Sequence, residues 1–358
     1  MSNPAFANCT RFLNGHGPRR AAAALEEAIA ELSPDEACDV YGAGTLIESF
    51  ESEIAELLGK ESAVFMPSGT MAQQIALRIW CDRNGSRNIA MHRTSHLEVH
   101  EQGAYEKLHG LSAHLLADDT RLLNMSDLQK LQLPLAALLW ELPQREIGGQ
   151  LPSWEELVRE TQWARDNGVA THLDGARLWE AAPHYEREIA EICALFDSVY
   201  VSFYKGLGGI AGAILAGDSK LIAEAKIWQR RHGGNLISLY PYILSARAGL
   251  NKHRGAFAGF RARAQSLAGQ LDTIEGISVV PKCPPTNMMH LHIAADADAL
   301  NRANSEIALR DKVQLFSRAR PVESGGSLVE LSMGLAGEQI SDDEAKRLFR
   351  DLLGRAHG

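Results

Sequence analysis

Cysteine is scarce in this chain of 358 residues, and its five copies are scattered along the sequence. Their number is odd and no Cys-x-x-Cys occurs, so the sequence offers neither a disulfide framework nor a zinc-binding motif. This cysteine usage is typical of a reducing compartment. The N-terminus also lacks the basic stretch and the apolar block of a signal peptide. We therefore expect a cytoplasmic protein.

Long apolar runs and excess positive charge are absent as well. No run approaches the roughly 20 residues that a membrane-spanning helix needs. The formal net charge of −9 argues against a nucleic-acid or acidic-membrane partner. Neither Gly-x-x-x-x-Gly-Lys-Ser/Thr nor Gly-x-Gly-x-x-Gly occurs, so nucleotide binding has no support. These features fit a soluble enzyme without a nucleic-acid or membrane partner.

Strand and helix patterns alternate over most of the chain, which predicts an α/β fold with a mostly parallel sheet covered by helices. Helices are expected over residues 19–32 (with Pro18 in the first turn), 46–58, 71–81, 154–167 and within 240–271. Strands are expected over residues 63–66, 88–92, 135–142, 169–173, 198–203 and 210–216, and near 279, 288–293 and 328–333. We expect an N-terminal arm (1–17), a large domain (18–245) and a small α+β domain (246–358).

Two polar motifs follow neighbouring strands in the large domain. Asp174 lies in Thr-His-Leu-Asp-Gly-Ala-Arg, and Lys205 lies in Ser-Phe-Tyr-Lys-Gly-Leu-Gly-Gly. Because ligands bind at the carboxyl ends of strands in open α/β sheets, both side chains should reach one site. A lysine binds pyridoxal phosphate (PLP) as a Schiff base, and an acid keeps the ring nitrogen protonated. Asp-Gly and Lys-Gly alone are ordinary turn dipeptides, so the prediction depends on their order, spacing and strand context.

A phosphate site is expected where Ser68, Gly69 and Thr70 follow a strand and begin a helix. Backbone amides and hydroxyls at a helix start bind anions, and glycine allows close approach. The alternative is that Ser68 or Thr70 is only a helix N-cap. The downstream Asp174 and Lys205 favour the phosphate site.

Three histidines and one arginine are further candidates. His92, His96 and His100 are four residues apart, a spacing that would align three metal ligands on a helix. The strand pattern at 88–92 and the lack of a nearby cysteine argue against metal, so we predict no metal site. His96 is instead expected to lie against the cofactor ring, and the other two to be structural. Arg177 is expected to contact a cofactor oxygen or a substrate carboxylate, although a surface ion pair is the alternative.

The sequence resembles the threonine aldolase family, a group of aspartate-aminotransferase-like, fold-type-I PLP enzymes also described as β-eliminating lyases. The resemblance spans about residues 41–217 and rests on these motifs: Tyr41-Gly42, Pro67-Ser-Gly-Thr-Met-Ala, Thr94-Ser-His, Glu101-Gln-Gly, His172-Leu-Asp-Gly-Ala-Arg and Lys205-Gly-Leu-Gly. The family is built of dimers, often paired into tetramers, with active sites at subunit interfaces. A homodimer or homotetramer is therefore expected.

The resemblance also implies a role for each motif. Lys205 would carry the Schiff base with PLP, Asp174 would pair with the ring nitrogen, and His96 would stack on the ring. The phosphate would be bound by Ser68, Gly69 and Thr70, and Ser202 is counted with the cofactor-binding residues. Arg177 would lie by the cofactor oxygen or the substrate carboxylate, and Tyr41 would reach the substrate from a neighbouring subunit.

The chain departs from the family pattern at several positions. Tyr204 stands before the lysine where serine is usual. Glu330 occupies the stretch where an arginine commonly binds the substrate carboxylate, and a glutamate would repel that group. Arg145, Arg318 or Arg320 could supply the missing guanidinium; of these we assign Arg145 to substrate binding.

The function implied is cleavage of the Cα–Cβ bond of a β-hydroxy amino acid, L-threonine or L-allo-threonine, to glycine and an aldehyde. His96, ahead of His100, is the expected base for the β-hydroxyl. The departures leave open a β-eliminating lyase that acts on a different amino acid or amine. A binding protein that carries PLP without catalysis is a third reading, which the full residue set disfavours.

Overall fold

The structure is a computed structural model that describes residues 4–33, 35–132, 134–323 and 325–358. The chain divides into two compact units. The larger unit comprises residues 20–146 and 151–254, and the smaller one comprises residues up to 19, 147–150 and 255–358. The expected boundary at residue 245 lies inside helix α11 (Tyr240–His253), and the division follows the end of that helix. In the described part of the chain, no helix combines the length and apolar character needed to cross a membrane.

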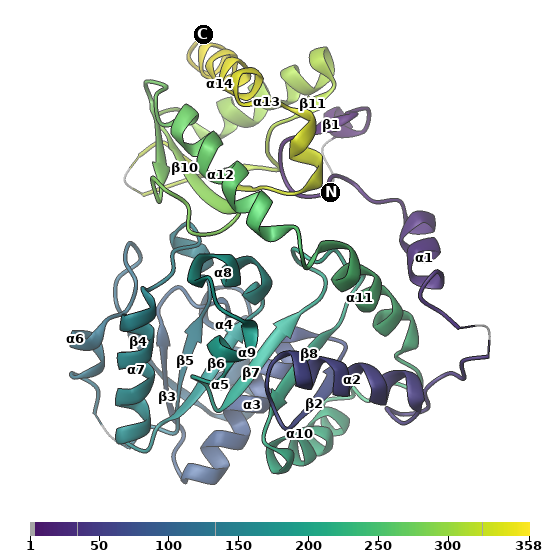
Figure 1. The fold of residues 1–358 in the computed structure, drawn as a ribbon. Coiled ribbons are helices and arrows are strands. Elements are labelled where there is room, and N and C mark those ends of the chain that lie inside the picture. Colours follow the sequence, from purple (N-terminus) through teal and green to yellow (C-terminus); the bar gives the residue numbers. More distant parts are fainter. Residues whose placement is uncertain (1–3, 34, 133, 324) are drawn as a thin grey trace. The chain divides into compact units, whose positions relative to one another are not determined.

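A seven-stranded sheet forms the centre of the larger unit (Figure 1). Its strand order is β2-β8-β7-β6-β5-β3-β4. Neighbours from β7 to β4 are parallel, whereas β8 is antiparallel to both β2 and β7. The strands are β2 (Ser62–Met66), β3 (Asn88–His92), β4 (Ser112–Leu116), β5 (Ala137–Glu141), β6 (Ala170–Gly175), β7 (Ser198–Ser202) and β8 (Ala213–Gly217). The predicted mostly parallel sheet is confirmed.

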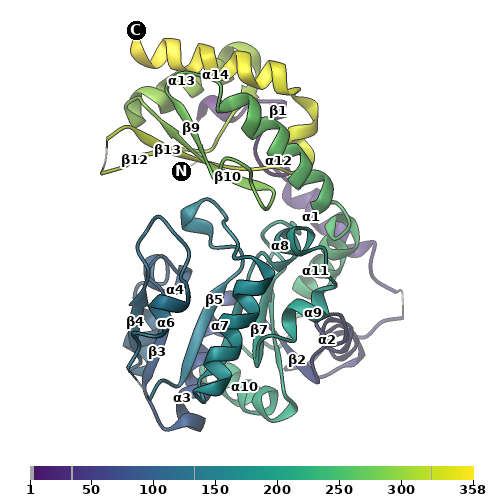
Figure 2. The same ribbon diagram turned by 60° about the vertical axis from the view of Figure 1, so that its left-hand side comes forward.

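Helices flank the two faces of this sheet (Figure 2). Alternation along β2 turns Val64 and Met66 toward α3 and α10, and turns Phe65 to the opposite face, where it packs on Phe50 of α2. The helices are α1 (Ala21–Ile29), α2 (Thr45–Leu57), α3 (Gly69–Asn84), α4 (His96–Val99), α5 (Ala104–His109), α6 (Met125–Leu128), α7 (Trp154–Asp166), α8 (Leu178–Tyr185), α9 (Ile189–Cys193), α10 (Ser219–Arg231) and α11. Pro18 precedes α1 instead of lying in its first turn.

The smaller unit is an α+β structure, as predicted. A four-stranded antiparallel sheet has the order β12-β13-β10-β9, and β1 pairs in parallel with β11. The strands are β1 (Arg11–Phe12), β9 (Ile277–Val280), β10 (Met288–Ile293), β11 (Val313–Gln314), β12 (Ala319–Pro321) and β13 (Ser327–Ser332). The helices are α12 (Phe257–Leu271), α13 (Ala297–Asp311) and α14 (Asp342–His357), with short 3-10 turns at Pro4–Phe6 and Leu335–Gln339. A further 3-10 turn, Arg145–Ile147, begins in the larger unit and ends in the smaller one. The expected arm thus contributes β1 to this unit, and its residues 1–3 lie outside the described residues.

Candidate active site

The predicted site residues of the larger unit follow strands that run in one direction. Ser68 follows β2, His96 follows β3, Asp174 lies near the end of β6, and Lys205 follows β7. In the register of the sheet, Glu141 at the end of β5 is directly opposite Asp174. The carboxyl ends of parallel strands therefore bring these groups to one edge, where α/β proteins bind ligands.

The turn after Lys205 depends on glycine. The amide of Gly208, whose φ is +74°, donates to the carbonyl oxygen of Lys205 at 2.9 Å. The amide of Gly209 donates to the carbonyl oxygen of Phe203 at 2.7 Å, and a Cβ at Gly209 would lie 2.8 Å from that same oxygen. A side chain at Gly209 would force the backbone apart, so this glycine permits the tight reversal into β8.

The amine of Lys205 lies in a buried, charged environment. Burial lowers the pKa of Lys205, and the nearby Arg177 guanidinium lowers it further. The carboxylates of Asp174, Glu141 and Glu180 act in the opposite direction. A lysine with a lowered pKa carries more of the unprotonated amine, which is the form that attacks an aldehyde.

Asp174 is buried and its two carboxylate oxygens have different partners. Oδ1 accepts the backbone N–H of Ala176 at 3.0 Å, and Oδ2 accepts the side-chain amide of Gln73. Burial raises the pKa of Asp174, whereas the charge of Lys205 and the Ala176 amide lower it. The pKa of Asp174 stays above its usual value, and the donors and the lysine charge offset part of the rise in the direction of the carboxylate form that a protonated ring nitrogen requires.

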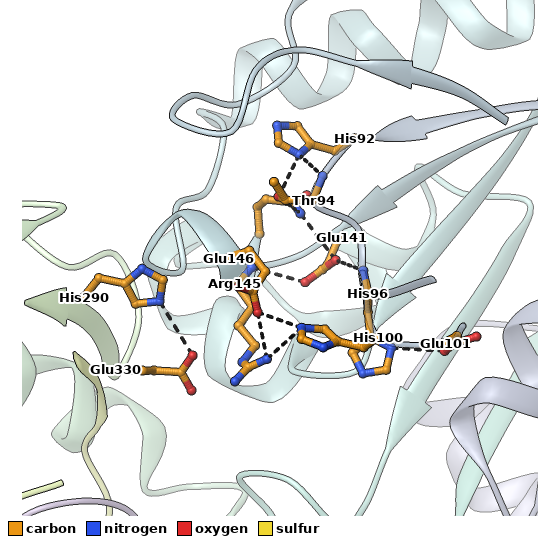
Figure 3. Close-up of polar contacts among 11 residues, drawn as sticks. His92, Thr94, His96, His100, Glu101, Glu141, Arg145, Glu146, His290 and Glu330 are labelled. Carbon is orange, nitrogen blue, oxygen red and sulfur yellow. Dashed lines mark hydrogen bonds and ion pairs between the residues drawn. The ribbon is translucent and has the colours of Figure 1, made fainter. Parts of the chain in front are cut away.

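His96 is paired with a buried carboxylate (Figure 3). Its Nδ1 lies 3.1 Å from Oε1 of Glu101, whose other oxygen accepts the Gln74 amide at 3.3 Å. The His100 ring lies beside the His96 ring, with centroids 5.1 Å apart. His92 lies in β3 and contacts Thr94 and the Arg121 carbonyl, so the three histidines do not share one helix face.

Glu141 contacts two separate segments, the start of α4 at His96 and the 3-10 turn that begins at Arg145 (Figure 3). Its carboxylate accepts the backbone N–H of His96 at 3.1 Å and that of Arg145 at 3.2 Å. Burial, together with the charge of Asp174, raises the pKa of Glu141 to about 7. The Arg145 guanidinium contacts Oε1 of Glu146 at 2.9 Å, and that same oxygen lies 2.9 Å from His100. The guanidinium predicted to bind substrate is therefore paired with a carboxylate of this chain.

The start of α3 has the features of an anion site. Ser68 occupies the N-cap position, but its side chain makes no capping hydrogen bond. The alternative in which Ser68 is only an N-cap therefore lacks the side-chain hydrogen bond that defines a cap. A Cβ at Gly69 would lie 2.5 Å from Cζ of Tyr200, so only glycine fits there. Ser202 is buried and donates to the Ala176 carbonyl at 3.1 Å.

Arg177 and Tyr41 differ in how far they are buried. Arg177 is the N-cap residue of α8, its side chain is 17% exposed, and its Nε lies 3.7 Å from Glu180. Tyr41 is 51% exposed, adopts a φ of +51°, and follows Asp39, whose carboxylate caps α11 through the amides of Leu239 and Tyr240. Arg177 is thus partly buried and pairs with a buried carboxylate, whereas Tyr41 projects from an anchored loop.

Other site candidates belong to the smaller unit. Arg318 precedes β12, Arg320 lies within it, and Glu330 lies in β13. Glu330 is opposite His290 of β10, and its Oε2 is 3.6 Å from His290 Nε2 (Figure 3).

Sequence reasoning missed three residues that contact the predicted ones: Gln73 on Asp174, Glu101 on His96, and Tyr200 beside Gly69. Helical spacing could have indicated Gln73, because this residue lies in the first turns of the helix that begins with the phosphate motif. Glu101 lies five residues after His96, beyond the end of the short helix α4. No local pattern assigns that contact.

The donor set fits PLP: a partly buried lysine that interacts with a buried carboxylate, an imidazole, and a helix start at which glycine is required. Together with the mostly parallel sheet, these features define a fold-type-I PLP enzyme. Residues 19–294 match the family model for β-eliminating lyases. The chain belongs to the β-eliminating lyase family, a family of PLP-dependent lyases that includes threonine aldolases.

Three relatives illustrate this membership. A Listeria monocytogenes EGD-E protein proposed to be an L-allo-threonine aldolase is 45% identical, with 98% of both chains covered and a TM-score of 0.93. An Exiguobacterium sp. 255-15 protein proposed to be an aromatic amino acid β-eliminating lyase/threonine aldolase is 40% identical, with the same coverage and TM-score. The low-specificity L-threonine aldolase 1 of Arabidopsis thaliana is 26% identical over 75% of this chain and 77% of its own length.

Proposed function

We propose that this protein cleaves the Cα–Cβ bond of a β-hydroxy amino acid, such as L-threonine or L-allo-threonine, to glycine and an aldehyde. The observation that carries the proposal is the His96–Glu101 pair in the same unit as Lys205 and Asp174. A paired imidazole is the kind of group that removes a hydroxyl proton, and the lysine and acid are the groups that PLP needs. The threonine aldolase relatives support the same reaction.

The cofactor would be bound by groups of the larger unit. Lys205 would bind PLP as a Schiff base, and Asp174 would keep a proton on the ring nitrogen. Ser68, Gly69 and Thr70 at the start of α3 would hold the phosphate, and Ser202 would belong to the same cofactor site. When bound, PLP supplies a ring that accepts the electron pair of the bond being broken.

The proton of the β-hydroxyl goes to His96 in this proposal. Glu101 accepts the Nδ1 proton of the imidazole, which leaves Nε2 as the basic atom. As His96 takes up the proton, the Glu101 carboxylate stabilises the imidazolium. His96 would also stack on the cofactor ring.

The substrate carboxylate is assigned to Arg177, with Arg145 as a second guanidinium. Arg177 interacts electrostatically with Lys205, which supports its place beside the reacting atoms. Arg145 would have to exchange its contact with Glu146 for the substrate. Tyr41 contributes from a neighbouring subunit, and its exposure in the single chain is consistent with such a role.

A β-eliminating lyase acting on a different amino acid or amine is the second candidate. Glu330 favours it, because a glutamate stands in the stretch where family members commonly carry the arginine that binds a substrate carboxylate. The Exiguobacterium relative, whose name includes aromatic amino acid β-eliminating lyase, points the same way.

A homodimer or homotetramer in the cytoplasm completes the proposal. All five cysteines are free, as expected for a reducing compartment. Mixing the inactive variants Tyr41→Ala and Lys205→Ala tests the shared site. If Tyr41 serves a neighbour's Lys205, hybrid dimers regain about one wild-type site each, whereas a site within one chain regains activity in no mixture.

The test of the reaction is an absorption spectrum of purified protein before and after L-threonine and L-allo-threonine, with acetaldehyde followed by a coupled dehydrogenase. We expect a yellow cofactor band that responds to at least one isomer, with aldehyde release. Lys205→Ala should lose the band. A band that ignores both isomers, with another amine consumed, would replace this proposal by the second candidate.

A further inference from the structure

A chain of buried hydrogen bonds leads to Asp174 from inside the larger unit. Trp80 Nε1 donates to Ser198 Oγ at 2.8 Å, and Ser198 Oγ lies 2.8 Å from His172 Nδ1. His172 Nε2 lies 2.7 Å from Gln73 Oε1, and Gln73 Nε2 donates to Asp174 Oδ2. No step of the proposed reaction uses Trp80, Ser198, His172 or Gln73.

Secondary structure explains how these side chains meet. His172 and Asp174 are two residues apart on β6, so they point to one face of the sheet. Ser198 is the register partner of His172 on β7. Gln73 and Trp80 are seven residues apart on α3, which places them on the same side of that helix.

The chemistry of the groups gives the chain a direction. A carboxylate only accepts hydrogen bonds, so the Gln73 amide turns its NH₂ to Asp174 and its oxygen to His172. His172 must then carry its proton on Nε2. Burial lowers the pKa of His172 to about 3, so the ring is neutral and Nδ1 accepts the Ser198 hydroxyl. Ser198 in turn accepts the indole N–H, which can only donate.

We propose that Gln73, His172 and Ser198 are positioning residues that hold Asp174 as a carboxylate aimed at the ring nitrogen of PLP. This inference rests on the proposed pairing of Asp174 with that nitrogen. Each member donates toward Asp174, so the ring-nitrogen proton has a charged acceptor and stays on the cofactor. Without the Gln73 donor, the buried carboxylate would keep only its hydrogen bond from the Ala176 amide, and a buried charge with fewer partners favours the protonated acid, which forms no ion pair with the ring.

The test compares how tightly the full-length apoprotein binds PLP and an analogue in which C–H replaces the ring nitrogen. Equilibrium dialysis measures both affinities, and Lys205 can form its Schiff base with either. Wild type should prefer PLP. Gln73→Met should weaken PLP binding by about tenfold or more and change analogue binding by less than about twofold, because a hydrogen bond to a charged group is lost. Ser198→Ala should shift PLP binding in the same direction by a smaller factor.

Gln229→Met is the matched control. Gln229 is a buried glutamine that donates to the backbone oxygens of Phe65 and Gly234. Its loss should leave the preference for PLP over the analogue unchanged.

Equal loss of both cofactors in Gln73→Met, or an unchanged preference, would overturn the inference while the proposed function stands. If Gln73→Met does not fold, Ser198→Ala decides by the same comparison. A wild-type protein that does not distinguish the two cofactors would instead refute the Asp174 pairing itself, and the inference with it.

Discussion

Replacing Glu101 by glutamine keeps the shape of the side chain and removes its charge. In the native site this carboxylate lies 3.1 Å from His96 Nδ1 and is almost fully buried. A hydrogen bond to a charged group contributes about 1.5–3 kcal/mol. Because the His96 side chain is 32% exposed, solvent screens part of this interaction. We therefore expect the loss of this interaction to cost about 1.5–2 kcal/mol of transition-state stabilisation, which corresponds to a fall of about 10- to 30-fold in kcat/KM.

A second effect depends on Gln74. Its amide Nε2 donates to the other oxygen of Glu101 at 3.3 Å, so a substituted amide keeps its oxygen toward Gln74. Its NH₂ group then faces His96 Nδ1 and shifts the imidazole proton to Nε2, which removes the basic atom. A tautomer change of this kind costs up to about 10⁴-fold in enzymes with a catalytic triad. The expected loss for Glu101→Gln is thus at least about tenfold, with the larger value if the amide takes this orientation.

The assay follows aldehyde release from L-allo-threonine and L-threonine with a coupled dehydrogenase. Glu98→Gln is the control, because Glu98 lies on α4 with His96 but accepts a hydrogen bond from the Tyr105 hydroxyl at 2.6 Å instead of contacting the imidazole. Its kcat/KM should stay within about twofold of wild type. A Glu101→Gln enzyme with wild-type kcat/KM would refute the role of the His96–Glu101 pair. An equal loss in both variants would indicate a general effect of removing a carboxylate from this segment of the chain.

Three further predictions concern the cofactor site and stability. Because the pKa of Lys205 is lowered, the rate at which apoprotein captures PLP should rise with pH, with a midpoint below the 10.5 of ordinary lysine. Stopped-flow absorbance measures this rate, and a midpoint at or above 10.5 would contradict the argument that burial lowers the pKa. Gly69→Ala should clash with Tyr200, lower the free energy of unfolding by about 1–3 kcal/mol and weaken PLP binding. Denaturant unfolding measures the stability and equilibrium dialysis the PLP affinity, and if both are unchanged the clash is excluded. The pKa of His172 is about 3 in the folded protein and about 6.5 in an unfolded chain. The stabilisation by the neutral ring should therefore be fully present above pH 6.5, and the free energy of unfolding should fall by up to about 1.4 kcal/mol per pH unit as the pH drops toward 3. His172→Gln should flatten that slope, and a slope identical to wild type would contradict the neutral buried ring.

Much of the larger unit could be predicted because its signals are local. Apolar runs ended by polar residues and glycine marked β2, β3, β5, β6 and β7 to within about two residues at each end. The same runs indicated that Asp174 and Lys205 end neighbouring strands. Strand β4 was missed, because most of its side chains are exposed and it lies at the edge of the sheet, where no alternating apolar pattern is needed.

The single helical region expected over 240–271 is two helices, α11 and α12. The interruption falls at Arg254–Ala256, around Gly255, a residue with low helix propensity. The reversed direction of β8 also escaped prediction. Strand direction depends on which neighbours pair, and the residues of β8 fit either direction.

Partners between side chains were the hardest part to foresee. Gln73 and Asp174 are 101 positions apart, and His172 and Gln73 are 99 apart. Their contact results from packing a whole helix on two strands, which composition and periodicity do not specify. The roles predicted for Lys205, Asp174 and His96 stay predictions until the cofactor experiments are done.

The division of the chain bears on how such an enzyme can diversify. Every residue assigned here to PLP lies within residues 20–254, while Glu330, Arg318 and Arg320 belong to the other unit. Mutations confined to residues 255–358 therefore leave every residue assigned to PLP unchanged. A library of variants confined to that segment should keep its yellow colour almost throughout, even where activity on threonine is lost. Colour would then report an intact catalytic apparatus, and new activities could be sought among coloured clones alone.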